Sequence, residues 1–131
     1  MIKRVALCIV ILMAIPFLLF AKDYSVIDFG AKGNGVSDDA SAIQKAIDAC
    51  SEAGGGNVVF STNHTFISGP VELKSNINIV LEANSVWKAN PDESIYKLSA
   101  FGENRGEGMM WIYAKDAKNI SITGKGTIHG N

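Results

Sequence analysis

Short β-forming segments recur along this 131-residue chain at a spacing near twenty residues, and this period constrains its fold more than any other feature. Three of the segments begin with an asparagine followed by strand-forming residues, at Asn57, Asn78 and Asn119. The second begins 21 residues after the first, and the third begins 41 residues after the second, which is nearly two periods. Such a period predicts a coiled β solenoid, in which each coil stacks on the previous one. A β-sandwich also contains short strands, but it gives no reason for a repeated asparagine.

The other apolar segments are short and separated by polar turns, as a solenoid requires. Between residues 90 and 108 a polar stretch that contains glycine interrupts the period. We expect this stretch to be an excursion from the coils, either on a binding face or as a solvated loop. The predicted strands are Tyr24–Phe29, Val58–Phe60, Thr65–Ile67, Val71–Leu73, Ile77–Leu81, Val86–Trp87, Trp111–Tyr113 and Ile120–Ile122.

One α-helix is expected, beginning at Asp39 and ending at the three glycines 54–56. Ser37 and Asp38 are suitable N-caps, and Gly54 suits the left-handed residue that often follows a helix. The apolar positions have the i, i+3, i+4, i+7 spacing of a helix with one buried face. They are Ile43, Ala46, Ile47 and Cys50, so Cys50 is predicted to be buried rather than reactive.

These patterns predict a mainly β protein, a coiled β solenoid with one α-helix near its N-terminal end. We expect the cap strand and helix within about 24–54 and the coils within about 57–131. Residues 122–131 predict a strand and a tight turn of a coil that nothing covers. We therefore expect a solenoid that is incomplete at its C-terminal end, as in the N-terminal part of a longer protein.

The first residues have the features of a secretory signal peptide. Two cations precede an unbroken apolar run at residues 5–20, which predicts a signal peptide over 1–21 with Ala21 as the last residue removed. An uncleaved membrane anchor is the alternative, because Leu19 is large where a small residue is preferred and the run approaches spanning length. Cleavage predicts a secreted protein, extracellular or periplasmic, without stable membrane association.

The mature domain, residues 22–131, is expected to be slightly acidic. Without Lys3 and Arg4 the 12 cations of the whole chain fall to ten, against 13 anions, which gives a net charge of about −3 at pH 7. No basic patch indicates a nucleic-acid partner.

Few residues suggest chemistry. Asp38 and Asp39 could form an acid/base pair or half of a calcium site, but carboxylates at a helix start stabilise exposed N–H groups and the helix dipole, so we predict a capping role. Gly30, Gly33 and Gly35 have the order G-x-x-G-x-G, and the pair at 124 and 126 lacks a third glycine, so neither matches a dinucleotide site. His64 and His129 are isolated in predicted turns. We predict no catalytic, cofactor-binding or metal-binding residue in this chain.

Four aromatic residues could stack on sugar rings: Trp87, Tyr96, Trp111 and Tyr113. Alternation places Trp111 and Tyr113 on the same face of one predicted strand. A buried aromatic stack between coils is the alternative interpretation.

Two parts of the chain resemble a known family. Residues 26–39 and 42–47 resemble the opening strand and capping helix of pectate-lyase-like β-helix enzymes. This resemblance implies a right-handed parallel β-helix whose N-terminal coils carry one capping α-helix. Residues 68–82, 87–89, 111–114 and 119–128 are similar to the N-terminal part of glycoside hydrolase family 28, the polygalacturonase family, so the resemblance covers nearly all of residues 24–131. That family usually has an aspartate where His129 stands, in a turn that we do not expect to be catalytic.

The resemblance implies a secreted enzyme that hydrolyses α-1,4-galacturonosyl bonds in pectin with inversion, without a metal or cofactor. One aspartic acid would protonate the leaving oxygen while other carboxylates activate a water. The family's Asn-Thr-Asp, Asp-Asp, Gly-His-Gly and Arg-Ile-Lys motifs do not occur at matching places here, so this chain alone is expected to be inactive. Its partner would be a pectic polysaccharide, bound through a full-length monomer.

Two alternatives to the hydrolase remain open. A polysaccharide lyase of the same fold would need calcium-binding carboxylates and a basic residue that removes the C5 proton of the sugar. A non-catalytic β-helix would only bind carbohydrate.

Overall fold

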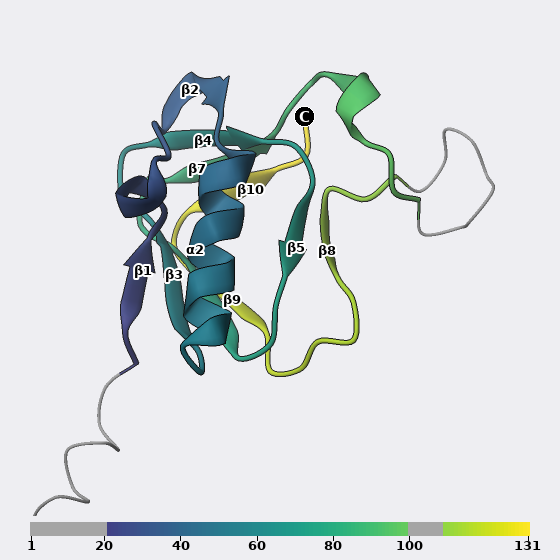
Figure 1. Cartoon of the computed structure of the whole chain (residues 1–131). Coiled ribbons are helices and arrows are strands. Elements are labelled where there is room, and N and C mark those ends of the chain that lie inside the picture. Colours follow the sequence, from purple (N-terminus) through teal and green to yellow (C-terminus); the bar gives the residue numbers. More distant parts are fainter. Residues whose placement is uncertain (1–20, 100–108) are drawn as a thin grey trace, which may run out of the picture.

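The computed structural model describes residues 21–99 and 109–131, and the ten strands of this part form three parallel sheets (Figure 1). The first sheet has the order β1-β3-β6-β9, made of Asp23–Ser25, Gly56–Phe60, Ile77–Leu81 and Ser121–Gly124. The second has the order β10-β7-β4-β2, made of Thr127–His129, Val86–Ala89, Thr65–Ser68 and Asn34–Asp38. The third pairs β5 (Val71–Leu73) with β8 (Ile112–Ala114).

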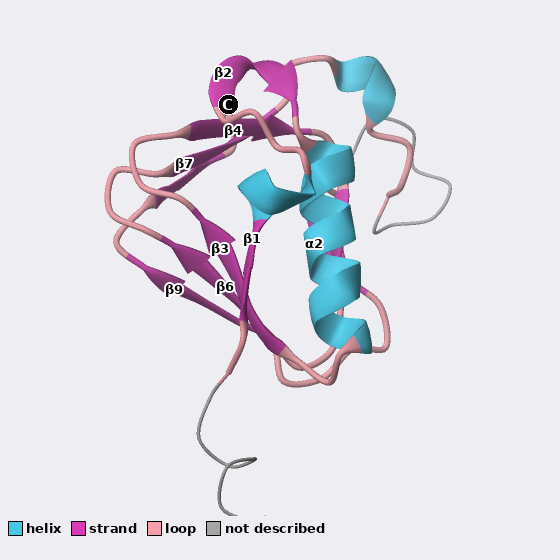
Figure 2. Ribbon diagram, turned by 60° about the vertical axis from the view of Figure 1, so that its left-hand side comes forward, coloured by secondary structure: helices cyan, strands magenta, loops and turns pink. Residues whose placement is uncertain are grey.

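The chain passes through the three sheets in turn, so each coil lies on the previous one (Figure 2). Side chains that are in register across the coils form columns inside the molecule. In one column, Val58 and Ile79 are fully buried, whereas Ile122 in the last described coil is 44% exposed. A second column contains Phe66, Trp87 and Ile128. The predicted mainly β fold, a parallel β-helix with a capping α-helix, is confirmed.

Helix α2 (Ala40–Glu52) packs beside β5, on the side away from β8 (Figure 1). It begins one residue later than predicted, and Gly54 has the expected left-handed conformation after it, with φ +97°. Its buried residues are those of the predicted apolar face, together with Ala42: Ile43, Ala46, Ile47 and Cys50.

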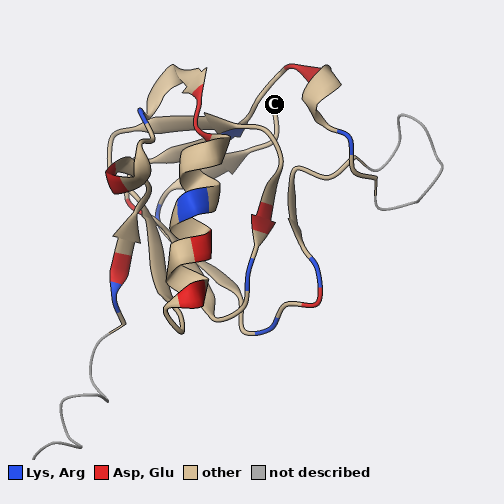
Figure 3. Ribbon diagram, in the orientation of Figure 1, with Lys and Arg blue, Asp and Glu red and all other residues tan. Residues whose placement is uncertain are grey.

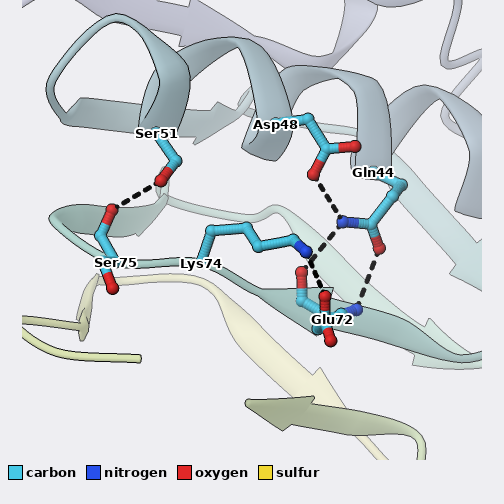
Figure 4. Close-up of polar contacts among 6 residues, drawn as sticks. All are labelled: Gln44, Asp48, Ser51, Glu72, Lys74 and Ser75. Carbon is cyan, nitrogen blue, oxygen red and sulfur yellow. Dashed lines mark hydrogen bonds and ion pairs between the residues drawn. The ribbon is translucent and has the colours of Figure 1, made fainter. Parts of the chain in front are cut away.

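Gln44 joins α2 to the edge of β5 (Figure 4). Its Nε2 donates to the carbonyl of Glu72 at 2.9 Å and its Oε1 accepts from the N–H of Glu72 at 2.9 Å. The same Nε2 donates to Asp48 at 3.0 Å, and Ser51 donates to the carbonyl of Ser75 at 2.9 Å. The amide of Gln44 therefore pairs with the backbone as a neighbouring strand would, and α2 closes an edge that would otherwise be open to association.

The first strand is shorter than predicted, so the expected strand Tyr24–Phe29 is wrong beyond Ser25. Residues Val26–Phe29 form the 3₁₀ helix η2. Gly30 follows it with φ +104°, and its N–H donates to the carbonyl of Ile27 at 3.0 Å. Val26, the first residue of η2, is completely buried.

Strand β2 occupies residues that the sequence assigned to a glycine loop and to helix caps. Five residues of β2 lie against three of β4, at 65–67, which makes a bulge in the pairing. The side-chain oxygen of Asn34 accepts from the N–H groups of Val36 at 3.0 Å and Ser37 at 2.9 Å and holds the bulge. Ser37 is thus a strand residue and not an N-cap.

The asparagine repeat holds for Asn57 and Asn78 but not for Asn119. Asn78 donates to Asn57 at 3.1 Å, 21 residues away, as the period predicts. Asn119 donates instead to Asn76 at 3.0 Å, and the residue in register with Asn78 is Ser121, 43 residues further along. β6 and β9 are neighbours in the first sheet, so these 43 residues form one coil that the excursion lengthens, and the interpretation of the spacing as nearly two periods is wrong.

The predicted excursion leaves the coils after β7, forms the 3₁₀ helix η3 (Glu93–Ile95) and returns at β8. Ser99 and Met109 form an antiparallel bridge within it. Residues 100–108 of the excursion, and residues 1–20 that hold most of the predicted signal peptide, lie outside the described part. In the described part, no helix has the length and apolar character needed to cross a membrane.

Candidate functional site

A pocket of about 610 Å³ lies where the excursion meets the end of the last described coil. Its residues come from the end of β7, from η3, from the segment before β8 and from the residues after β10. The polar and aromatic side chains among them make this the candidate site. They are Asn90, Glu93, Tyr96, Trp111 and Asn131.

Asp38 connects the cap to this pocket. One carboxylate oxygen accepts from the N–H of Ala40 at 2.8 Å, which is the predicted capping role. The other accepts from the N–H of Gly69 at 3.0 Å and from the side-chain amide of Asn90 at 2.6 Å. The hydroxyl of Tyr96 donates to the carbonyl of Asn90 at 2.7 Å. Asp38 therefore fixes the start of the excursion to the cap, across 52 residues of sequence.

Asp39 does not have the predicted capping role. It is 3% exposed, and its two oxygens accept from the N–H groups of Lys32 at 2.9 Å and Gly33 at 3.1 Å. No N–H of the helix donates to this side chain, because its carboxylate accepts from the glycine loop instead. Asp38 and Asp39 thus have separate partners and do not form a pair.

Two tryptophans share one hydroxyl beside the pocket. The indole N–H groups of Trp87 and Trp111 both donate to Ser68, at 2.7 Å and 3.3 Å. Trp87 is fully buried and stacks on Phe60 with ring centroids 4.7 Å apart, and Trp111 meets it edge-on at 5.7 Å. The predicted buried aromatic stack between coils is present, and Trp87 is not available to a sugar.

The expectation that Trp111 and Tyr113 share a strand face is wrong. Trp111 lies at a bend before β8 and packs against the core. Tyr113 is in register with Glu72, between residues of β8 that pair with the buried Val71 and Leu73. Alternation applies only within a strand, and Trp111 is outside it.

The excursion holds two groups with shifted pKa values. Partial burial, together with the nearby charges of Asp38 and Asp92, raises the pKa of Tyr96, so its phenol stays protonated and donates at neutral pH. Hydrogen bonds from the hydroxyl and N–H of Ser94 lower the pKa of Asp92. These hydrogen bonds favour the charged carboxylate of Asp92 and fix it at the start of η3.

The two histidines have different hydrogen-bond partners. The Nδ1 atom of His64 is hydrogen-bonded to the carbonyl oxygen of Thr62 at 2.7 Å, and the imidazole ring stacks on Phe66. His129 ends strand β10, rather than lying in a turn, and accepts from the N–H of Asn131 at 3.1 Å. Within the described ranges, no three His, Cys, Asp or Glu side chains are grouped so that they could hold a metal ion. Cys50 is buried as predicted, and this burial raises the pKa of its thiol.

Sequence reasoning missed Ser68 and Asn90, which position the aromatic and polar walls. Asn90 lies outside the segments that are similar to a known family, and Ser68 is only the first residue of one of them, residues 68–82. The partner of Asn90 is Asp38, 52 residues away in sequence, and the partners of Ser68 are the two tryptophans, 19 and 43 residues away. Only the register of the coils brings them together.

The class of protein follows from the parallel coils and the helical cap, and comparisons with known proteins agree with it. A family model described as rhamnogalacturonase A/epimerase, pectate lyase-like, matches residues 24–129. The chain belongs to this family, within the pectate-lyase-like β-helix proteins, as the resemblance in the sequence implied.

The relatives include more than one kind of enzyme. Mannuronan C5-epimerase AlgE2 of Azotobacter vinelandii is 51% identical over 123 residues, covering 79% of this chain and 12% of that protein. A polygalacturonase of Malus domestica is 33% identical over 113 residues, covering 85% of this chain and 22% of that protein. The crystal structure of an exopolygalacturonase from Thermotoga maritima superposes with a TM-score of 0.71 at 31% identity, covering 84% of this chain and 25% of that chain. The chain thus spans less than a quarter of the length of these two curated relatives.

Proposed function

We propose that this chain forms the helix-capped end and first coils of a secreted, polysaccharide-active β-helix enzyme, and that its pocket is part of the wall of the substrate cleft. The observation that carries the proposal is the family match over residues 24–129 on a fold of parallel coils. The position of the pocket supports the second part, because insertions in solenoids gather on the face that binds ligands. The proposal includes a signal peptide at 1–21 and a monomeric full-length protein.

Within this class we propose hydrolysis of α-1,4-galacturonosyl bonds in pectin. Two relatives named polygalacturonase and exopolygalacturonase support it. Inverting hydrolysis needs two carboxyl groups about 6.5–9.5 Å apart with room for a water. The oxygens of Asp38 and Asp39 are taken by backbone and amide donors. Glu93 is the one carboxylate among the described residues lining the pocket. We therefore propose that the catalytic carboxylates are not in this chain and that it is inactive alone.

A second candidate is chemistry at C5 of a uronic acid. The 51% identity with a mannuronan C5-epimerase is the observation that favours this chemistry. A base would remove the C5 proton, and the reaction would end by return of a proton to the opposite face in an epimerase or by elimination in a lyase. Both candidates share a uronic-acid polymer as substrate. A β-helix that only binds carbohydrate is a third candidate, and it would show binding without turnover in the full-length protein.

The test incubates the purified protein with polygalacturonate and with mannuronan. Release of reducing ends reports hydrolysis, unsaturated products report elimination, and the NMR signals of the sugar rings report inversion at C5. Oligosaccharides of each polymer are also titrated to compare binding. We expect no turnover, and tighter binding of oligogalacturonate than of oligomannuronate. Release of reducing ends that is lost in Asp38→Ala would contradict both the inactivity and the structural role of that residue, and failure to bind either oligosaccharide would contradict the proposed function.

A further inference from the structure

The outer face of the sheet β10-β7-β4-β2 carries two basic side chains next to each other. Phe66 and Trp87, which are in register on β4 and β7, are fully buried and point into the molecule. Successive residues of a strand point to opposite faces of a sheet, so the residues that follow these two in sequence lie on the outer face. The row that they form is in register across three strands, at Ile67, Lys88 and His129. Neighbouring strands are about 4.8 Å apart, so Lys88 and His129 lie side by side.

Both side chains bring hydrogen-bond donors to this face. The Nδ1 atom of His129 accepts from the N–H of Asn131 at 3.1 Å, so the proton of the neutral ring is on Nε2, at the other end of an exposed side chain. Lys88 supplies a positive charge and three donors. Its side chain is half-buried, which reduces the freedom that the ammonium group loses when it binds a ligand. A cation beside a second donor suits an anion that presents two oxygens, such as a carboxylate or a sulfate.

The carboxylate of Asp38 lies in the same row but is engaged elsewhere. Asp38 is in register with Ile67, two strands from Lys88, which corresponds to roughly 10 Å. Its oxygens already accept three hydrogen bonds. The one ion pair between described residues joins Lys74 to Glu72, and Figure 3 shows acidic and basic positions following one another along α2. The presence of two adjacent donors is what favours an anion on the outer face of β7 and β10.

We infer that Lys88 and His129 bind an anionic group of a polysaccharide, either the carboxylate of a uronic acid or a sulfate ester. The residues directly after them, Ala89 and Gly130, line the pocket, so a polysaccharide that contacts the pocket also reaches this pair. The inference rests on the proposed function for its polymer. It adds the place at which the charge of that polymer is recognised and the two side chains that recognise it.

The test titrates three oligosaccharides of equal length into the protein: oligogalacturonate, its full methyl ester and a sulfated oligogalactan. NMR follows the imidazole C–H signals of His129 and the signals of the methylene group beside the ammonium of Lys88. We expect at least one of the two anions to shift these signals. The methyl ester should bind about three- to tenfold more weakly than the better anion, because it cannot form a charge-assisted hydrogen bond. Comparison of the two anions identifies whether the site takes a carboxylate or a sulfate.

Two variants test the pair itself. Lys88→Met removes the charge and keeps an apolar stem, so the better anion should bind about three- to tenfold more weakly and the ester should be unaffected. His129→Asp places a carboxylate in register with Lys88, where it pairs with the ammonium and repels the ligand, so the loss should be at least as large. Lys45→Met, the same substitution at an exposed position of α2, is the matched control and should leave both affinities unchanged.

Three results would overturn the inference: an ester that binds as tightly as both anions, signals of His129 and Lys88 that do not move, or equal affinities in Lys88→Met and Lys45→Met. Binding of oligogalacturonate to the unaltered protein separates these failures from that of the proposed function. If the oligosaccharide binds and any of the three results is found, only the assignment of this pair is wrong. If none of the three oligosaccharides binds, the proposed function fails as well.

Discussion

At the scale of single residues, adjacent side chains of identical chemistry have different tasks. Asp38 is exposed and links three elements, whereas Asp39 is buried and serves one loop. Backbone direction decides this, because Asp38 ends a strand and Asp39 begins the turn into α2. Asp38 and Asp39 therefore have separate structural roles, although they are adjacent in sequence.

Asp39→Ala should destabilise the protein by about 2–4 kcal/mol, because it leaves the buried N–H of Gly33 and the partly buried N–H of Lys32 without their acceptor. Asp39→Asn keeps one side-chain oxygen and should cost about half as much. The measurement is the free energy of unfolding in urea. Glu52→Ala, an exposed carboxylate, should change it by less than about 0.5 kcal/mol. A similar small change in Asp39→Ala would contradict the role given to this carboxylate.

Two neighbouring glycines allow the cost of a backbone conformation to be separated from the cost of a clash. Gly54 and Gly55 have φ values of +97° and +113°. A Cβ on Gly54 would meet open space, whereas one on Gly55 would lie 2.4 Å from the carbonyl oxygen of Asn76, which accepts from the N–H of Gly56. Gly54→Ala should cost about 1–2 kcal/mol for the left-handed conformation alone.

Gly55→Ala should cost at least about 1 kcal/mol more than Gly54→Ala, since the carbonyl of Asn76 must move and weaken its own hydrogen bond. Chemical denaturation of the two variants side by side gives the comparison. Equal stabilities would show that the coil yields at this contact.

At the scale of elements, α2 ends the solenoid by hydrogen bonding as well as by burial. The amide of Gln44 pairs with both backbone groups of Glu72 on the edge of β5. A buried apolar face alone would cover the interior and leave this edge unpaired. In this helix the side chain of Gln44 supplies both the donor and the acceptor that face the strand.

Gln44→Ala should remove this pairing and cost about 1–2 kcal/mol. The amide of Glu72 should then exchange its hydrogen about 5–30 times faster, measured by NMR under native conditions. Lys45→Ala, at the exposed neighbouring position of α2, is the control and should leave that exchange rate unchanged. An unchanged exchange rate in Gln44→Ala would mean that water forms equally good hydrogen bonds with the backbone of Glu72.

The elements predicted from sequence are those with a local period. The spacing of Ile43, Ala46, Ile47 and Cys50 is enough to locate α2, and alternation is enough to find most strands. The 3₁₀ helix η2 and the bulged strand β2 were missed, because each depends on one residue. The turn at Gly30 ends η2, and the side chain of Asn34 holds the bulge of β2. The walls of the pocket could not be predicted at all: the bond from Asn90 to Asp38 depends on the register of coils, which the excursion shifts.

At the scale of the whole molecule, the two ends of the described coils differ. At one end α2 and η2 cover the interior. At the other, β9 and β10 are the outer strands of their sheets, and the interior columns reach the surface at Ile122 and Ile128, 44% and 40% exposed. Open strand edges with apolar side chains beside them favour association between molecules.

The purified protein should therefore associate in proportion to its concentration, with the uncovered coil at the contact. Ile122→Lys combined with Ile128→Lys should shift it toward monomer, because charges on an edge strand oppose pairing. Val36→Lys is the matched control: Val36 is 83% exposed on β2, at the opposite edge of the same sheet as β10, and should leave association unchanged. Sedimentation velocity over a range of concentrations measures the outcome.

If the unaltered protein sediments as one monomeric species and melts cooperatively, the coil at β9 and β10 does not need a further layer to be stable. If the control variant abolishes association instead, the contact lies at the β2 edge and not at the uncovered coil.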